Sequence, residues 1–140
     1  MHANDRQAIV AELRTFAAFA ACSKDDLDAL VAQAAEFAVP AHWSLLHQDI
    51  PAHSLYIIRE GSATVFDGRR EIASLAQGDV IGEMAFLTGS RRTATVSSIT
   101  RLSGLRIGYR ALHRLVTERP QLAEALWSVY DTRVAVAKAS

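Results

Sequence analysis

Hydrophobic residues recur at helical spacing at the N-terminal end of the chain. The apolar residues of this stripe are Ile9, Leu13, Phe16, Ala17 and Ala20. Their period predicts an amphipathic helix over the first twenty or so residues. A second helix is expected from Ser23 to near Ala35, because the Ser23 hydroxyl can cap it while Asp26, three residues on, completes a capping box. Both helices need a surface on which to pack their apolar faces.

The middle of the chain, from Phe37 to about Leu105, has a different pattern. Short β-branched and aromatic runs alternate with turn residues: FAV, SLL, SLYII, ATVF, EIASL, DVIG, TATVSS and RLSGLRI. Their spacing predicts about eight strands in an antiparallel, jelly-roll-like β-roll. The pair Asp67-Gly68 predicts a hairpin turn, because glycine accepts the positive φ that such turns require.

Helical spacing returns at the C-terminal end. It starts near Tyr109, and Pro120 suits the first turn of a last helix that runs towards Lys138. The order is helices, then strands, then helices. We therefore expect an α+β fold in which the β-roll is flanked by helices at both ends, in one domain over residues 1–140.

Composition narrows the class of protein. Lysine plus arginine equals aspartate plus glutamate at 15 each, so no net field attracts nucleic acid or an anionic membrane. No stretch approaches the roughly 18 to 20 apolar residues that span a bilayer. Cys22 is the only cysteine, and charged residues interrupt the apolar N-terminal pattern. A disulfide and a signal peptide are thus not indicated, and we expect a cytosolic protein without a nucleic-acid partner and without membrane insertion.

The segment from Gly78 to Ser98 departs from the strand pattern. EMAFL contains good helix formers, and Gly82 and Gly89 flank it, so one short helix is expected between two strands. Free backbone N–H groups and the dipole at the start of a helix favour an anion. Arg91 and Arg92 follow across a short loop and could hold a phosphate against it. Glu83 would repel that anion unless it has its own donor, and a ribose hydroxyl is such a donor.

This segment resembles the phosphate-binding cassette of the cyclic nucleotide-binding domain family, which includes catabolite activator proteins, regulatory subunits of cAMP-dependent kinase and cyclic nucleotide-gated channels. The residues that carry the resemblance are GEMAFL, TGS and RRTATV, from Gly82 to Val96. LYIIREGSATV, from Leu55 to Val65, is also similar to the second and third strands of the family. Two departures are Arg91, where proline is common, and Asp49-Ile50 in place of a Gly-Asp turn.

The resemblance implies a binding site in the cassette. Glu83 would accept from the ribose 2′-hydroxyl and Arg92 would hold the cyclic phosphate, with backbone amides near the helix start completing the anion site. The expected cyclic nucleotide-binding residues are Gly82, Glu83, Met84, Ala85, Arg91, Arg92, Thr93 and Ala94. The ligand would be cAMP or cGMP, with cAMP slightly favoured. The Thr93 hydroxyl does not decide between them, because one neutral hydrogen bond contributes only about 0.5 to 1.5 kcal/mol. No further cofactor is expected.

Arg133 interrupts the apolar stripe of the last helix. At 100° per residue it lies within about 40° of Leu122, together with other apolar residues. A charged residue in that place must reach solvent, pair with an acid or cover a ligand. In the resembled family the last helix closes over the base as a lid. The resemblance therefore makes Arg133, supported by Leu126 and Tyr130, a candidate for capping the base.

These features predict a cyclic nucleotide sensor or regulatory module, not an enzyme, that transmits ligand occupancy through movement of its last helix. Its partner would be an effector protein or domain, or a second copy in a homodimer. The alternative is the same fold without a ligand, acting as an interaction or dimerisation domain. A third hypothesis is a metal-dependent, cupin-like enzyme using His42, His47 and His53. We expect no metal site, because the His-x-His pair of that fold is absent.

Overall fold

The structure, a computed structural model, describes residues 3–46, 53–89 and 94–139 of the chain. Arg91, Arg92 and Thr93 lie outside the described residues, as does His47. The helices are α1 (Ala3–Leu13), the 3-10 helix η1 (Ala17–Phe19), α2 (Lys24–Gln33), α3 (Glu83–Thr88), α4 (Tyr109–Glu118) and α5 (Pro120–Ala139). The strands are β1 (Ala35–Val39), β2 (Ser44–Leu46), β3 (Ser54–Glu60), β4 (Ala63–Asp67), β5 (Arg70–Leu75), β6 (Val80–Ile81), β7 (Thr95–Ser98) and β8 (Leu102–Gly108).

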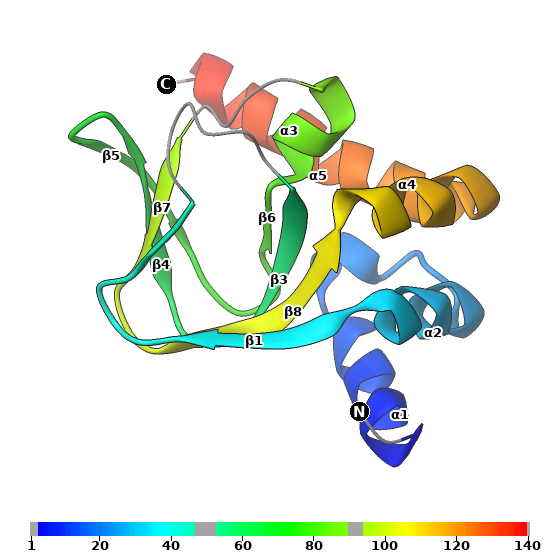
Figure 1. The fold of residues 1–140 in the computed structure, drawn as a ribbon. Helices are drawn as coiled ribbons and strands as arrows, with labels where there is room; N and C mark the ends of the chain where they lie inside the picture. The colour runs from blue at the N-terminus through cyan, green and yellow to red at the C-terminus, as the bar shows by residue number, and fades with distance from the viewer. Residues whose placement is uncertain (1–2, 47–52, 90–93, 140) are drawn as a thin grey trace.

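The strands form two antiparallel sheets that face each other, as Figure 1 shows. One sheet has the order β1-β8-β3-β6 and the other the order β2-β7-β4-β5. β3 and β4 follow each other in sequence but belong to different sheets, so the turn at Gly61 carries the chain from one layer to the other. The expected jelly-roll-like β-roll with flanking helices is confirmed.

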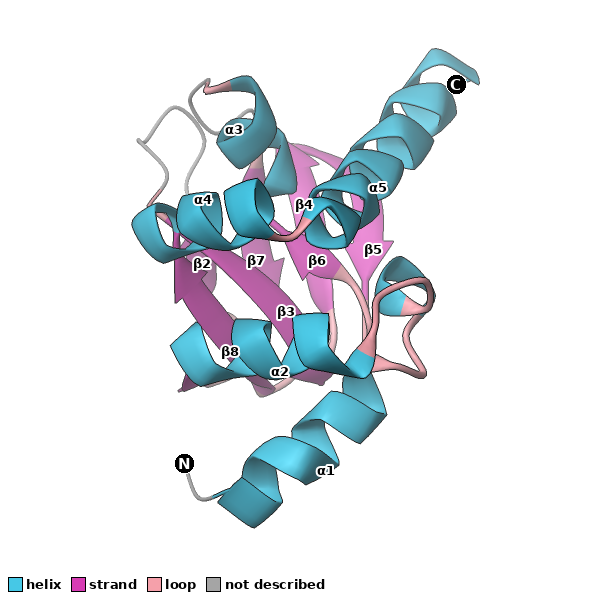
Figure 2. Cartoon of the chain, turned by 90° about the vertical axis from the view of Figure 1, so that its right-hand side faces the viewer, coloured by secondary structure: helices cyan, strands magenta, loops and turns pink. Residues whose placement is uncertain are grey.

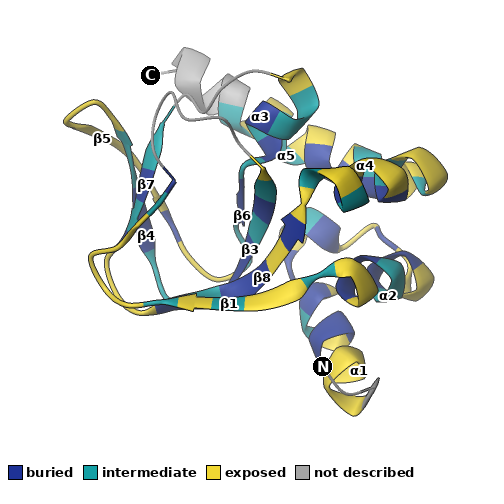
Figure 3. Ribbon diagram, viewed as in Figure 1, coloured by how far each residue is buried: buried dark blue, intermediate teal, exposed yellow. Residues whose placement is uncertain are grey.

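Residues on the two faces of β3 enter two different cores. Ile58 joins Leu46, Leu75 and Val96 between the two sheets. Leu55 and Ile57 join a larger core that includes apolar residues of α1, α2, α4 and α5. Figure 2 shows these helices covering one side of the roll. β3, in the middle of the first sheet, is thus buried on both faces, whereas β5 is an exposed edge strand of the second sheet (Figure 3).

The first helix is shorter than its apolar stripe predicts. α1 ends at Leu13, and the amides of Thr15 and Phe16 donate three residues back, with Phe16 N to Leu13 O at 3.1 Å. The Thr15 hydroxyl also donates to a carbonyl of the last turn, Glu12 O, at 2.6 Å. Phe16 and Phe19 remain buried after this break. The apolar spacing therefore reports burial correctly, although the backbone leaves the α-helix.

The cap of α2 is confirmed in one half only. Ser23 Oγ accepts from the Asp26 amide at 3.1 Å. The Asp26 carboxylate, however, binds Arg119 at the junction of α4 and α5, with Nη1 to Oδ1 at 3.0 Å. An ion pair between two helices has replaced the reciprocal bond of a capping box. The β4–β5 hairpin turn is shifted by one residue from the expected pair Asp67-Gly68. Asp67 pairs with Arg70, so the two turn residues are Gly68 and Arg69.

Two further polar contacts tie helices to the rest of the fold. Arg59 on β3 binds Glu12 of α1 through both carboxylate oxygens, at 3.0 and 3.1 Å. The buried Cys22 thiol donates to the carbonyl of Gln121, in the first turn of α5, at 3.7 Å. Within the described residues, no helix has the length and hydrophobicity to cross a membrane.

Candidate functional site

Two glycines set the limits of α3. Gly82 directly precedes the helix with φ of 97°, and Gly89 follows it with φ of 69°. These left-handed conformations are accessible to glycine at little cost. β6, only two residues long, leads into Gly82 without a loop, so the edge of the first sheet places Glu83 at the start of the helix. The short helix between flanking glycines, expected from EMAFL, is confirmed.

Glu83 is a buried carboxylate with one unsatisfied oxygen. Its relative exposure is 1 %. Oε1 forms an ion pair with Arg133 of α5, whereas Oε2 has no hydrogen-bond partner among the described residues. Leaving a buried acceptor without a donor costs about 1–3 kcal/mol, and more when the group is charged. A buried acceptor without a partner can accept a hydrogen bond from a ligand.

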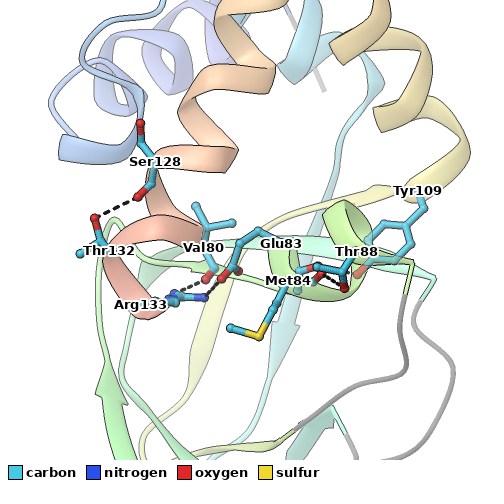
Figure 4. A network of polar contacts seen from close by, with 9 residues as sticks. Val80, Glu83, Met84, Thr88, Tyr109, Ser128, Thr132 and Arg133 are labelled. Carbon is cyan, nitrogen blue, oxygen red and sulfur yellow. Dashed lines mark hydrogen bonds and ion pairs between the residues drawn. The ribbon is translucent and has the colours of Figure 1, made fainter. Parts of the chain in front are cut away.

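Arg133 joins the last helix to the segment around Glu83. Its guanidinium donates to the Glu83 carboxylate through Nη1 and to the carbonyl of Val80 through Nη2, as Figure 4 shows. The sequence left three possibilities for this charge: solvent, an acid or a ligand. In the structure it pairs with an acid, while its side chain stays 29 % exposed. Its guanidinium is therefore bound to the cassette itself.

A pocket of about 600 Å³ lies beside this ion pair. The volume falls within the range of about 300–1,000 Å³ that is typical of small-ligand sites. β5 forms one wall, the start of α3 another, and Thr132 and Arg133 of α5 reach the pocket from the last helix. The described residues that line it are Leu46, Val65, the six residues of β5, Ile81, Gly82, Glu83, Met84, Ala85, Ala94, Val96, Thr132 and Arg133.

The structure gathers most of the expected site residues that it describes. Gly82, Glu83, Met84, Ala85 and Ala94 all line the pocket. The expected contacts of Arg91, Arg92 and Thr93 stay predictions, because these residues lie outside the described ranges.

Two candidates for capping the base lie elsewhere. Leu126 is 2 % exposed and belongs to the core between the helices and the first sheet. Tyr130 packs edge-on against Trp127, with ring centroids 5.4 Å apart. Neither is among the described residues that line the pocket. Helical spacing placed Leu126 on the same side as Arg133 but could not say where that side meets the core and where it meets the pocket.

Other residues near the site were not expected from the sequence. Tyr109 donates its hydroxyl to the carbonyl of Gly82 at 2.5 Å. β5 brings two charged residues, Arg70 and Glu71, to the pocket wall. The sequence predicts Tyr109 only as an apolar position at the start of a helix, and no local signal distinguishes it from a core residue. The sequence did predict a strand at EIASL, which β5 confirms with one more residue, but not which of its faces meets a cavity.

Comparison with known proteins identifies the same family that the segment from Gly82 to Val96 resembles. The sequence model for the cyclic nucleotide-binding domain matches residues 36–119, which is more than half of the chain. The cAMP-activated global transcriptional regulator CRP of Salmonella typhimurium is 34% identical over 103 residues, covering 69% of this chain and 49% of that protein. A cAMP-dependent protein kinase regulatory subunit of Hypocrea atroviridis is 32% identical over 72 residues, covering 51% of this chain and 16% of that protein.

The fold also matches solved structures. The Thermus thermophilus catabolite activator protein superposes with a TM-score of 0.78 at 20% identity, over 86% of this chain and 59% of that one. The present chain thus spans about half, or less, of the length of the curated relatives named above. The family match covers the β-roll from Glu36 onwards, together with Gly82 to Val96 and all of α4. The chain belongs to the cyclic nucleotide-binding domain family.

Proposed function

We propose that the domain binds a cyclic nucleotide, with cAMP as the first candidate, in the pocket between α3, β5 and α5. The observation that carries this proposal is the state of Glu83. One of its oxygens is paired with Arg133, and the other is buried at the pocket without a donor among the described residues. Glu83 occupies the glutamate position of the Gly-Glu pair in the family pattern, so a ribose 2′-hydroxyl is the donor that fits it.

The cyclic phosphate requires a cation in the pocket that is free to bind it. Arg133 is already paired with a carboxylate. The resemblance assigns this role to Arg92, which in the sequence follows Gly89 at the end of α3 and precedes Ala94 on the pocket wall. An arginine suits this role because its planar fork donates two charge-assisted hydrogen bonds to phosphate oxygens. Both relatives are named for their dependence on cAMP, which supports the preference for adenine.

Ligand occupancy would act on the position of α5. Arg133 connects this helix to Glu83 and to Val80, at the two ends of a four-residue segment. A ligand that contacts Glu83 and Thr132 binds with different affinity when α5 is docked and when it is not. The ligand shifts the population of the docked helix by that difference in affinity and no more. The domain would thus serve as a regulatory module rather than as an enzyme.

Calorimetric titration with cAMP and cGMP tests the proposal. We expect saturable binding by the wild-type domain, and loss of a bidentate phosphate contact in Arg92→Ala should weaken it by about ten-fold to over a hundred-fold. Arg101→Ala, at an exposed arginine between β7 and β8, is the matched control and should bind like the wild type. No heat at high micromolar concentrations of either nucleotide would reject the sensor and favour the ligand-free interaction domain.

A further inference from the structure

Tyr109 contacts the cassette from the first turn of α4. Its hydroxyl donates to Gly82 O at 2.5 Å, and its backbone amide donates to His53 O at 2.8 Å. The ring lies against Phe86 of α3, with centroids 5.1 Å apart and an angle of 57° between the planes. Figure 4 shows Tyr109 approaching α3 from the side opposite Arg133. The segment that contains Glu83 is therefore held by two helices, α4 at a carbonyl and α5 at a carboxylate.

The carbonyl that Tyr109 holds belongs to the peptide group between Gly82 and Glu83. A peptide group is planar, so a bond that fixes the direction of the Gly82 carbonyl also fixes the plane from which the Glu83 backbone continues. Gly82 has φ of 97°, in a region where glycine moves with little steric restraint. The other described donor to this carbonyl is Phe86 N, at 3.3 Å. The short phenol bond is thus the stronger restraint on an otherwise permissive residue.

The direction of this peptide matters because Glu83 has almost no freedom of its own. Its carboxylate is buried, one oxygen is paired with Arg133, and the other has no hydrogen-bond partner among the described residues. A small rotation of the peptide would move that second oxygen relative to a hydroxyl bound in the pocket. Hydrogen bonds weaken steeply with misalignment, so the position of this oxygen determines the strength of the hydrogen bond that it accepts from a ligand.

From these contacts we propose that Tyr109 is a positioning residue for ligand binding. Its hydroxyl acts through the Gly82 carbonyl to hold the Glu83 carboxylate where the ribose 2′-hydroxyl of the nucleotide is bound. Tyr109 itself does not line the pocket among the described residues, so its effect on the ligand is indirect. This inference rests on the proposed function, and it adds a residue that the cassette pattern does not contain.

The substitution Tyr109→Phe isolates the hydroxyl, because it keeps the ring that packs on Phe86. Tyr56→Phe is the matched control. Tyr56 is also half-buried and also packs its ring on a phenylalanine, Phe37 at 5.1 Å, but it is not among the described residues that line the pocket. Both variants are titrated with cAMP and with 2′-deoxy-cAMP, and their urea midpoints are measured to confirm that they are folded.

We expect Tyr109→Phe to weaken cAMP binding by about two- to twelve-fold, the equivalent of one hydrogen bond. Binding of 2′-deoxy-cAMP should change less than two-fold, because that ligand lacks the hydroxyl that Glu83 would accept. Tyr56→Phe should bind both ligands like the wild type. Unchanged cAMP binding, or equal losses for both ligands, would overturn the role of Tyr109 while leaving the proposed function standing. A wild-type domain that binds no cyclic nucleotide would reject both proposals.

Discussion

Arg133 and Glu83, fifty residues apart in the sequence, form an ion pair that fastens the last helix to the start of α3. Glu83 is buried and Arg133 is partly exposed, so the pair lies at the boundary between the protein interior and the pocket. The Val80 carbonyl accepts a second bond from the same guanidinium. The pair therefore connects three elements, β6, α3 and α5, at one point of the fold.

Arg133→Met should destabilise the domain, because it leaves a buried carboxylate without its cation. We expect the free energy of unfolding to fall by about 1–3 kcal/mol or more. The double variant Arg133→Met with Glu83→Gln should recover part of this loss, since removing both charges also removes the cost of burying one alone. Urea unfolding followed by circular dichroism measures both effects. Arg114→Met, on the exposed face of α4, is the control, and equal stability of the two single variants would contradict the prediction.

Arg59 should stabilise the packing of α1 through the two hydrogen bonds of its planar guanidinium fork, and not through its charge alone. It binds both oxygens of Glu12, with side chains 26% and 30% exposed. We expect Arg59→Met to lower the free energy of unfolding by about 1 kcal/mol and Arg59→Lys to recover only part, because lysine lacks the planar fork. Arg106→Met, at an exposed position of β8, provides the baseline for both. Full stability of Arg59→Lys would show that charge suffices.

Cys22 should make stability fall at alkaline pH. Burial, and after it the negative charge of Asp26, raises the pKa of the Cys22 thiol above its ordinary value. As the pH rises past about 8.5, the unfolded chain loses this proton while the folded protein retains it. The contribution is complete below that pH and is lost as the pH climbs towards the folded pKa.

The measurement for Cys22 is the free energy of unfolding of wild type and Cys22→Ala between pH 7 and 10. The difference between the two proteins should shift in favour of the alanine variant as the pH rises. Other groups titrate in the same range, but they are common to both proteins and cancel in the comparison. A difference that does not change with pH would contradict the prediction.

Two glycines with positive φ should respond differently to alanine. Gly68 has φ of 61°, and a Cβ there would meet nothing within 4 Å, so Gly68→Ala should cost only the left-handed conformation, about 1–2 kcal/mol. At Gly61, with φ of 96°, a Cβ would lie 2.2 Å from the Arg101 carbonyl. Gly61→Ala should therefore cost about 1–3 kcal/mol more, because backbone must move. Thermal melts compare the two, and equal losses would contradict the crowding at Gly61.

The sequence predicted those parts of the fold that depend on local patterns. The β-branched and aromatic run of β3, the glycines at both ends of α3 and the start of α5 at Pro120 all have local causes, and each matches the structure. The break after Leu13 was missed because the apolar spacing continues through it to Phe16 and Phe19. Spacing reports which side chains are buried, not whether hydrogen bonds continue to form four residues back.

The part of the candidate site that is formed by consecutive residues was predictable from the sequence. Glu83 and its neighbours are consecutive, so one motif places them together. Contacts made across long separations were not predictable. Arg133 was recognised as a charge in an apolar stripe, but its partner could be known only once α5 was seen against α3. The Tyr109 bond has the same character, because a phenol at a buried helix position gives no indication of the carbonyl that it meets.

The bond from Arg133 to Val80 concerns more than the pocket. Val80 belongs to β6, the two-residue strand at one edge of the sheet, and an unpaired edge is a template to which the strand of another molecule can add. In the structure, the Arg133 guanidinium of α5 donates to this edge carbonyl. Without α5 in this position, that carbonyl would have only water or the strand of another molecule to bind. The last helix thus supplies a donor to one acceptor of a sheet edge to which a strand of another molecule could otherwise add.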